Sequence, residues 1–463
     1  MPKFAYLLGA CIILASCGGG GGSSGGSTGT PAPSPAPAPA PTPTPTPTPS
    51  VVTVTFPHVF GITDGDAAQP SSPLLHLSDG NFYGVSPVGG GNACGPNSDS
   101  CGTVFKMTPS GDVTVIYKFG ASASGGYSPG GPLILGNDGA LYGTAAGGAY
   151  DRGVVFRITL SGAYSVVYSF GASATDGVSP TGIVLGTDGN FYGTTVTGGA
   201  NHCANIPQAG GNCGTVFKLT PAGVETVLYS FGAYASDGVE PTAPLIQGRD
   251  GNFYGTTLNG GANACSMLGE TNDCGTVFRV TPTGVVTILH SFGTGRTSGS
   301  FMTTDGIAPQ GPLIQGNDGA FYGTTVAGGQ GRGANGFGRG TVYRITAAGD
   351  ITILYQFALD NATDGYEPSP YLIQGTDGNF YGTTGSGGTI GGDLNGTVFK
   401  LTPAGVKTTL YSFGLLNQSP SHPASGVIQA RDGSFYGMLT YNGMLGAVGD
   451  RFGRGAVFKM VVQ

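Results

Sequence analysis

Residues 244–257 read PLIQGRDGNFYGTT, and residues 275–292 read GTVFRVTPTGVVTILHSF. Both stretches recur along the chain with small changes. In every copy an Asp-Gly pair is followed, five residues after the Asp, by the Gly of a Tyr-Gly pair. Successive copies lie 50 to 68 residues apart, a spacing typical of repeat architectures. The seven anchor residues are Asp79, Asp138, Asp188, Asp250, Asp318, Asp377 and Asp432.

Each repeat contains four short runs rich in Val, Ile, Leu, Phe, Tyr and Thr. In the fourth repeat these runs are residues 244–247, 252–257, 275–281 and 286–292. The last two alternate in polarity, as half-buried strands do. Asp-Gly joins the first two runs and Pro-Thr-Gly joins the last two, and both are turn-forming sequences. We therefore expect four antiparallel strands, named A to D in chain order, in each repeat.

The two ends of the repeat region complement each other. The seventh repeat stops after a strand C at residues 455–460, whereas residues 51–60 read as a strand D without a repeat of its own. The sequence therefore predicts an all-β fold: a seven-bladed β-propeller of four-stranded antiparallel blades, whose last blade is closed by the N-terminal strand. An open solenoid would not need a partner strand from the opposite end of the chain.

Loop length varies on one face of this predicted propeller. The A–B turns keep one length in all seven repeats, and the C–D turns do so in the six complete ones. The B–C connection, in contrast, runs from 10 residues (Gly143 to Gly153) to 21 (Gly193 to Gly214), and the D–A connection also varies. B–C and D–A loops share one face, here called the rim face, and the fixed turns form the opposite turn face. Binding sites tend to lie on loops held by a rigid scaffold, although unconstrained drift would give the same variation.

Six of the eight cysteines form three pairs, and each pair lies within one B–C loop. In an exported chain such pairs favour local disulfides. Zinc is the alternative, but the pairs lie in different blades and only His202 is near one of them. The pairs are Cys94 with Cys101, Cys203 with Cys213, and Cys265 with Cys274.

The N-terminal region has the features of a lipoprotein leader. Residues 1–16 contain Lys3, an apolar run and Leu14-Ala15-Ser16, after which Cys17 completes a lipobox. Residues 17–50 then form a Gly/Ser- and Pro-rich linker, and residues 51–463 form the propeller. A plain secretory signal peptide is the alternative. We expect a membrane-tethered protein of the cell envelope, at the outer membrane or cell surface because Gly18 replaces the Asp of an inner-membrane retention signal.

Residues 51–463 resemble the GloVer (Gloeobacter/Verrucomicrobium-type) tandem-repeat family of bacteria. The hallmark is DGNFYGTT followed by GTVFKLTP, and three repeats retain it almost unaltered, at residues 188–195 with 214–221, 250–257 with 275–282, and 377–384 with 396–403. The resemblance implies an extracytoplasmic repeat protein with no established activity or catalytic residues.

Two groups of polar residues are candidate binding sites. The first is a set of rim-face acids in Asp-Gly motifs, with His202 nearby, which would suit Ca²⁺ or a basic partner; an Asx-type turn is the alternative. The second is a set of strand A residues that would line the central channel, unless they are satisfied core groups. The rim set is Asp64, Asp176, Asp237, Asp305 and Asp364, and the channel set is His76, Gln247, Gln315, Gln374 and Gln429.

The sequence favours a binding or scaffold protein over an enzyme. Its histidines are scattered, and no G-x-S-x-G elbow with partners or H-E-x-x-H motif is recognisable. The chain has no Trp on which a quinone cofactor would stack, so we expect no cofactor and no metal beyond Ca²⁺ at the rim. Only 9% of residues are charged and the net charge is −7, without a basic stripe for nucleic acid. We expect a monomer that binds a glycan or protein, with a lyase or hydrolase acting on a polysaccharide or lactone as the alternative.

Overall fold

The structure is a computed structural model in which the chain divides into two units, Met1–Pro49 and Ser50–Gln463. The predicted signal peptide, Cys17 and the linker lie outside the residues that the structure describes. Among the described residues, no helix is long and apolar enough to cross a membrane. The described residues are 51–61, 65–70, 72–91, 101–120, 123–203, 213–263, 265, 274–295, 303–329, 338–357, 364–388, 395–414, 421–441 and 455–463.

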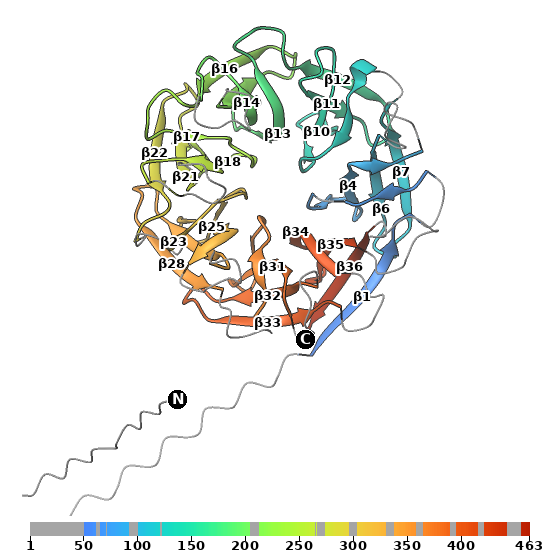
Figure 1. Cartoon of the computed structure of the whole chain (residues 1–463). Helices are drawn as coiled ribbons and strands as arrows, with labels where there is room; N and C mark the ends of the chain where they lie inside the picture. The colour runs from blue at the N-terminus through green and yellow to red at the C-terminus, as the bar shows by residue number, and fades with distance from the viewer. Residues whose placement is uncertain are drawn as a thin grey trace, which may run out of the picture. The chain divides into compact units, whose positions relative to one another are not determined.

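Seven antiparallel four-stranded sheets stand around a central axis, with strand A innermost and strand D outermost (Figure 1). This confirms the predicted seven-bladed propeller. Strands A to D are β3 (Leu75–His76), β4 (Phe82–Ser86), β6 (Thr103–Met107) and β7 (Val113–Lys118) in blade 1; β9 (Ile134–Leu135), β10 (Leu141–Ala146), β11 (Val154–Ile158) and β12 (Tyr164–Ser169) in blade 2; and β13 (Gly177–Leu185), β14 (Phe191–Gly198), β15 (Thr215–Leu219) and β16 (Glu225–Ser230) in blade 3.

The remaining blades repeat the pattern. They are β18 (Ile246–Gln247), β19 (Phe253–Thr257), β21 (Thr276–Val280) and β22 (Val286–Ser291) in blade 4; β24 (Ile314–Gln315), β25 (Phe321–Thr325), β27 (Thr341–Ile345) and β28 (Ile351–Gln356) in blade 5; β30 (Ile373–Gln374), β31 (Phe380–Ser386), β32 (Thr397–Leu401) and β33 (Lys407–Ser412) in blade 6; and β34 (Ser421–Gln429), β35 (Phe435–Tyr441), β36 (Ala456–Val462) and β1 (Val52–Val59) in blade 7.

Short additional strands extend the inner pairs toward the rim face. They pair with each other or with strand B, and one 3₁₀ turn, η1, precedes the piece in blade 2. These elements are β2 (Ala67–Ala68) with β5 (Val88–Gly89), η1 (Ala123–Gly125) and β8 (Tyr127–Pro129), β17 (Gly238–Val239) with β20 (Asn259–Gly260), β23 (Thr303–Ile307) with β26 (Ala327–Gly329), and β29 (Tyr366–Pro368).

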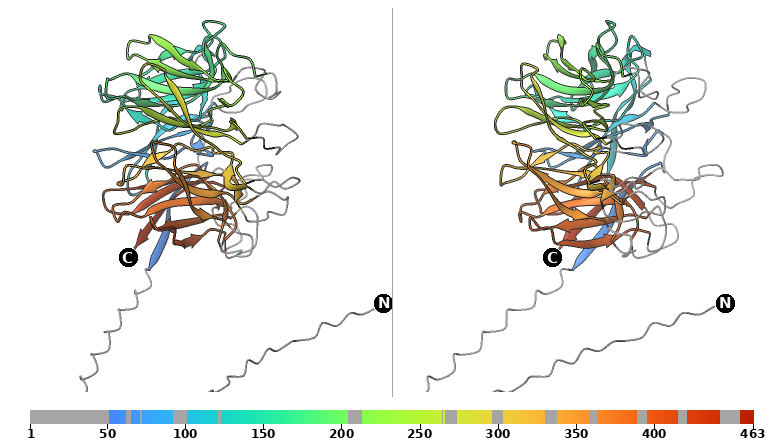
Figure 2. Two further views of the ribbon diagram at one scale, coloured as in Figure 1. Left: turned by 90° about the vertical axis from the view of Figure 1, so that its left-hand side faces the viewer. Right: turned by 60° about the vertical axis from the view of Figure 1, so that its left-hand side comes forward.

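The N-terminal strand closes the ring as predicted. β1 pairs antiparallel with β36, from Val52 opposite Val462 to Val59 opposite Ala456. Figures 1 and 2 show β1 in blue beside the red strands of blade 7. Val52, Val54 and Phe56 pack against a buried cluster that contains residues of blades 6 and 7. The first strand of the propeller is therefore an integral part of its last blade.

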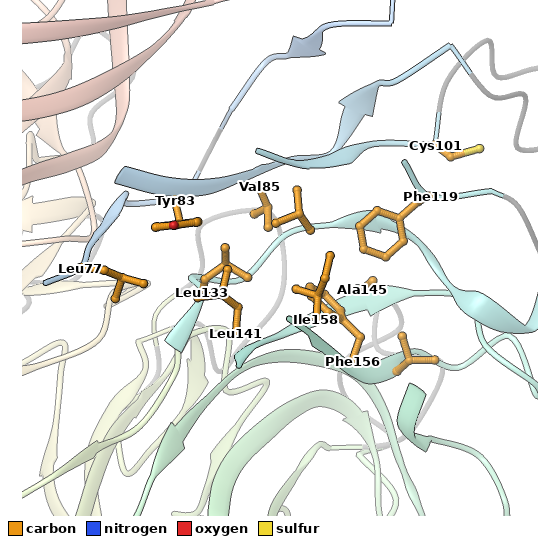
Figure 3. Close-up of a cluster of buried hydrophobic side chains, with 12 residues drawn as sticks. Leu77, Tyr83, Val85, Cys101, Phe119, Leu133, Leu141, Ala145, Phe156 and Ile158 are labelled. Carbon is orange, nitrogen blue, oxygen red and sulfur yellow. The ribbon is translucent and has the colours of Figure 1, made fainter. Parts of the chain in front are cut away.

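The hydrophobic core lies between neighbouring blades rather than at the axis. Between blades 1 and 2, Tyr83 and Phe119 of one sheet face Leu141 and Phe156 of the next (Figure 3). The rings of Phe119 and Phe156 are edge to face with centroids 5.3 Å apart. The Gly of each Tyr-Gly pair makes room for such packing: a Cβ on Gly255 would lie only 2.7 Å from the Phe278 ring. The repeated apolar residues therefore form an interface at every blade junction.

A backbone clamp also joins neighbouring blades where strand A begins. A non-glycine residue followed by Pro has a positive φ of 48–60° in every blade. In six blades its N–H donates to a carbonyl just before strand C of the preceding blade; Ser179 N, for example, donates to Arg152 O at 2.8 Å. The clamp brings each blade's B–C loop against the next blade on the rim face. The seven residues are Gln69, Ser128, Ser179, Glu240, Ala308, Glu367 and His422.

Candidate functional site

The turn face is occupied by a repeated hydrogen-bond network. Asp250 Oδ2 accepts hydrogen bonds from the Tyr254 hydroxyl at 2.7 Å and from Asn252 Nδ2 at 2.8 Å. In blade 3, burial opposes ionisation of Asp188, but hydrogen bonds from Asn190 and Lys218 outweigh it and hold the pKa of this carboxyl well below its usual range. These carboxylates are ionised and already paired, so they stabilise the hairpins of this face.

The rim-face aspartates are buried and turned inward. Asp176 Oδ2 accepts from the Tyr168 hydroxyl at 2.9 Å and from Gly171 N at 2.7 Å, and Oδ1 accepts from Gly177 N at 2.7 Å. Burial raises the pKa of Asp237, and its hydrogen bonds oppose that rise. This geometry matches the structural-turn alternative. The four described aspartates are between 3% and 6% exposed: Asp176, Asp237, Asp305 and Asp364.

In the first blade the corresponding carboxylate is Asp66, which was not among the residues predicted from the sequence. Its oxygens accept from Gly61 N at 2.9 Å and from Ala67 N at 2.8 Å, as Asp176 does five residues after Gly171 and one before Gly177. The five-residue spacing after the Gly that ends strand D would have identified it. Asp64, the residue chosen from the sequence, lies outside the described residues.

Disulfides close the B–C loops of blades 3 and 4 and lie against the Gly that follows strand D. Cys203 bonds Cys213 and Cys265 bonds Cys274, with S–S distances of 1.97 and 2.03 Å, which confirms both predicted pairs. Cys101 is also disulfide-bonded, and its predicted partner Cys94 lies outside the described residues.

His202 is exposed beside the disulfide of blade 3. The part of the chain that the structure describes contains no group of three or more His, Cys, Asp or Glu residues arranged to hold a metal ion. Ca²⁺ at the rim therefore stays a prediction from the sequence.

The strand A glutamines connect neighbouring blades. Gln247 Oε1 accepts from Thr187 N of blade 3 at 2.9 Å, while Nε2 donates to Gly251 O of its own turn at 3.1 Å. His76 instead stacks on Phe82 with centroids 4.6 Å apart. These groups fit the alternative of satisfied structural residues. The pattern of Gln247 recurs in Gln315 with Arg249, Gln374 with Asn317, and Gln429 with Thr376.

A polar cavity opens on the rim face at the junction of blades 2 and 3. Its volume is about 300 Å³, at the small end of the range for small-molecule sites. The additional strand β8 of blade 2 contributes Tyr127 and Ser128, the B–C loop contributes Asp151 and Arg152, and the start of strand A in blade 3 contributes Ser179. None of these residues was predicted from the sequence as a candidate site. They lie together because the backbone clamp brings blade 3 against the short B–C loop of blade 2.

Arg152 occupies the position that a disulfide cysteine holds in blades 3 and 4. A Cβ on Gly171 would meet the aliphatic part of Arg152, as one on Gly232 would meet the sulfur of Cys213. The Tyr127 hydroxyl donates to Asp151 Oδ1 at 3.2 Å. Burial raises the pKa of Tyr127, and the Asp151 charge raises it further. The cavity thus combines a guanidinium, a carboxylate and a protonated phenol, which together can donate and accept hydrogen bonds.

Comparison with known proteins identifies the repeat. The model of the Gloeobacter/Verrucomicrobia repeat matches residues 46–207, 97–300 and 266–463, which together span the propeller. The resemblance noted from the motifs is therefore confirmed. No curated protein matches the sequence.

Several solved structures align with this chain at low sequence identity. The extracellular domain of a protein described as a hybrid two component system from B. thetaiotaomicron has a TM-score of 0.49 and 12% identity, over 87% of this chain and 40% of that one. An ulvan lyase has 0.48 and 9%, over 83% and 93%. The periplasmic gluconolactonase of Pseudomonas aeruginosa has 0.44 and 15%, over 82% and 99%. The chain thus spans about two fifths of the B. thetaiotaomicron domain, and all three TM-scores lie below 0.5.

Proposed function

The chain belongs to the Gloeobacter/Verrucomicrobia repeat family, and we propose that it is a non-enzymatic, surface-tethered binding propeller of the bacterial cell envelope. Lipidation at Cys17 would anchor it at the outer membrane or cell surface, and the linker up to residue 50 would separate the propeller from the bilayer. Pro-rich sequence favours extended geometry of about 3.1 Å per residue, which suits this spacing role.

The contrast between the two faces supports binding on the rim face. On the turn face, carboxylates such as Asp250 and Asp188 are used to hold hairpins of constant length. On the rim face the loops differ between blades, two of them are fixed by disulfides, and a cavity presents Asp151 and Arg152 to solvent. Of these differences between the two faces, the cavity is the observation that carries the choice of the rim face.

The chemistry of the cavity favours binding over catalysis. An eliminating or hydrolysing enzyme needs a base, and the one carboxylate that lines the cavity, Asp151, already accepts a hydrogen bond from the Tyr127 hydroxyl. Tyr127 has its pKa raised by burial and by Asp151, so its phenol stays protonated near neutral pH. Its hydroxyl is instead suited to hold the Asp151 carboxylate in place.

The experiment is a glycan and protein array probed with the purified full chain, read both for retained ligand and for released product. We expect retention without product. Arg152→Ala should weaken retention, whereas Thr283→Ala on the turn face should leave it unchanged, because Thr283 lies in a C–D turn far from the loops. Release of a shortened or ring-opened product would establish the enzymatic alternative. Loss of binding in the turn-face variant alone would show that the wrong face was chosen.

A further inference from the structure

We propose that the cavity between blades 2 and 3 binds one residue of a neutral saccharide. The proposal rests on the binding role proposed above and specifies its ligand. It follows from the shape of this junction, from an unpartnered hydroxyl inside it, and from the set of donors and acceptors around it.

Two segments that are shorter than their counterparts in the other blades meet at this junction. The B–C loop of blade 2, from Gly143 to Gly153, is the shortest of the seven. In blade 3 the segment from the left-handed residue to the end of strand A, Ser179 to Leu185, is one residue shorter than in the other six blades. In blade 3 this segment belongs to one strand, β13, whose register against β14 shifts between Pro180 and Gly182. Both shortened segments border the cavity, so the space results from the local chain lengths of these two blades.

Thr144 places an unpartnered hydroxyl in the cavity wall. It is 1% exposed, and within the described part of the chain its Oγ1 has no hydrogen-bond partner. The Thr383 hydroxyl of blade 6 is also buried without a hydrogen-bond partner among the described residues, but Thr383 does not line this cavity and Thr144 does. A buried hydroxyl without a partner is unfavourable, and a ligand hydroxyl at this position would satisfy it. In three other blades the equivalent Thr donates to the next blade: Thr194 to Ala243 O, Thr256 to Gly311 O, and Thr324 to Ser369 O.

Arg152 is available to a ligand in a way that its counterpart in blade 5 is not. Arg339 holds the same repeat position, and its guanidinium lies 3.5 Å from the centroid of the Tyr366 ring in blade 6. Blade 3 has Val178 where blade 6 has Tyr366, so that stacking is not possible for Arg152. The ion pairs of the described residues do not include Arg152 either. Its donors therefore face the cavity and solvent.

Tyr127 offers an apolar ring surface beside these polar groups. The residue is 36% exposed, and a Cβ on Gly147 would lie 2.7 Å from two of its ring carbons. The ring is held against the backbone at Gly147 and by the bond from its hydroxyl to Asp151. An aromatic ring fixed in this way can pack against the C–H groups of a sugar ring.

The charges favour a neutral ligand. Asp151 and Arg152 are adjacent and sum to zero, so the cavity presents one strong acceptor and one strong donor without a net field. Neighbouring hydroxyls of a sugar can accept from the guanidinium and donate to the carboxylate at once. An acidic sugar would gain from Arg152 but would be repelled by Asp151, and the size of the cavity suits a single ring rather than a chain.

The test uses isothermal titration calorimetry of the full chain in detergent with the methyl glycosides of glucose, galactose and mannose, and with methyl glucuronide as the charged comparison. We expect saturable binding of at least one neutral glycoside and weaker binding of the glucuronide. Arg152→Ala and Thr144→Val should each weaken binding by about tenfold. Affinity should change little between about 0.02 and 0.3 M salt, since a neutral ligand has no charge to screen.

Two matched variants separate recognition from folding. Arg339→Ala removes the arginine of the corresponding position in blade 5 and should leave the affinity unchanged. Thr194→Val removes an inter-blade hydrogen bond, so it should lower the melting temperature without altering the affinity. Thr144→Val should instead weaken ligand binding without lowering the melting temperature. Valine fits this position, because blade 1 has Val85 there. The inference is overturned if no neutral glycoside binds, if the glucuronide binds more tightly, or if Arg152→Ala and Thr144→Val bind like the parent. Ligand binding elsewhere on the rim would then leave the proposed function standing.

Discussion

Val52 lies opposite Val462 in one antiparallel sheet, so the first strand of the propeller and the last residues of the chain stabilise the same blade. Deleting residues 51–60 removes Val52, Val54 and Phe56 from the cluster that they cover and leaves β36 as an unpaired edge. We expect the thermal midpoint to fall by roughly 5 °C or more. A thermal melt followed by circular dichroism measures this, with deletion of residues 31–49 as the control. Equal midpoints for both deletions would mean that β1 does not stabilise the ring.

This closure was predictable because it depends on local sequence patterns. Turns equivalent to Asp250-Gly251 and Thr283-Gly284 recur with the same spacing in every complete repeat. The strand order and the number of blades therefore follow from the number of repeats. The cavity depends on chain lengths in two neighbouring blades and on their contact in space. The single-residue shortening between Ser179 and Leu185 was visible in the sequence, but its consequence for Thr144 requires the packing of one blade on the next.

The rim aspartates illustrate a second limit. Their motif was recognised, but the motif does not say whether a carboxylate faces solvent or the backbone. Asp176 faces the backbone because the Tyr168 hydroxyl and three N–H groups converge on it. The choice between ligand and turn therefore depended on how the Tyr168 hydroxyl of strand D and the backbone N–H groups of the loop are placed around the carboxylate, which the sequence does not give.

Replacing Asp237 by Ala should destabilise the connection between blades 3 and 4. Its carboxylate accepts from the Tyr229 hydroxyl at 2.7 Å and from Gly232 N at 2.9 Å, and removing it leaves these buried donors unpaired. We expect a loss of about 3 kcal/mol or more in the free energy of unfolding, measured by denaturant titration. Asp112→Ala, at an exposed turn, is the control and should change stability by less than about 0.5 kcal/mol. A stable Asp237→Ala protein that has lost Ca²⁺ or ligand binding would instead favour the binding interpretation.

The disulfides should stabilise the rim loops without being required for the fold. Cys203–Cys213 and Cys265–Cys274 close loops of only 10 and 9 residues in separation, so each contributes about 2–4 kcal/mol at most. Reduction should lower the thermal midpoint but leave the β-sheet spectrum unchanged at room temperature. Peptide mapping without reductant should also recover Cys94 linked to Cys101. A free Cys94, or unfolding on reduction at room temperature, would contradict this prediction.

Replacing Gln315 by Leu should cost little, although it removes a hydrogen bond between blades. Its amide oxygen accepts from Arg249 N at 2.9 Å, and a hydrogen bond of this kind contributes about 1 kcal/mol. Leu135 and Leu185 occupy the same position in blades 2 and 3, so leucine fits there. Denaturant titration should show a loss of about that size with the fold retained. A severe loss would mean that the inner ring of amides acts cooperatively.

Lys407 and Glu225 occupy the first position of strand D in blades 6 and 3, and these side chains of opposite charge each lie beside a rim-face aspartate. Lys407 forms a buried ion pair with Asp364. Glu225 instead lies near the Asp176 carboxylate; burial first, and then that charge, raise the pKa of Glu225 from its ordinary 4.5 to about 7. At a pH between these two values, Glu225 is therefore protonated in the folded state and ionised in the unfolded chain.

The sign of the resulting pH dependence follows from this difference in bound protons. Between about pH 4.5 and 7 the folded state binds more protons than the unfolded chain, so stability falls as pH rises through this window and levels off above it. Glu225→Gln should remove this slope, as measured by denaturant titration at several pH values. Glu225→Lys should go further and gain stability at neutral pH, because it recreates beside Asp176 the pair that Lys407 makes with Asp364. An unchanged slope in Glu225→Gln would show that Glu225 is not the group that titrates.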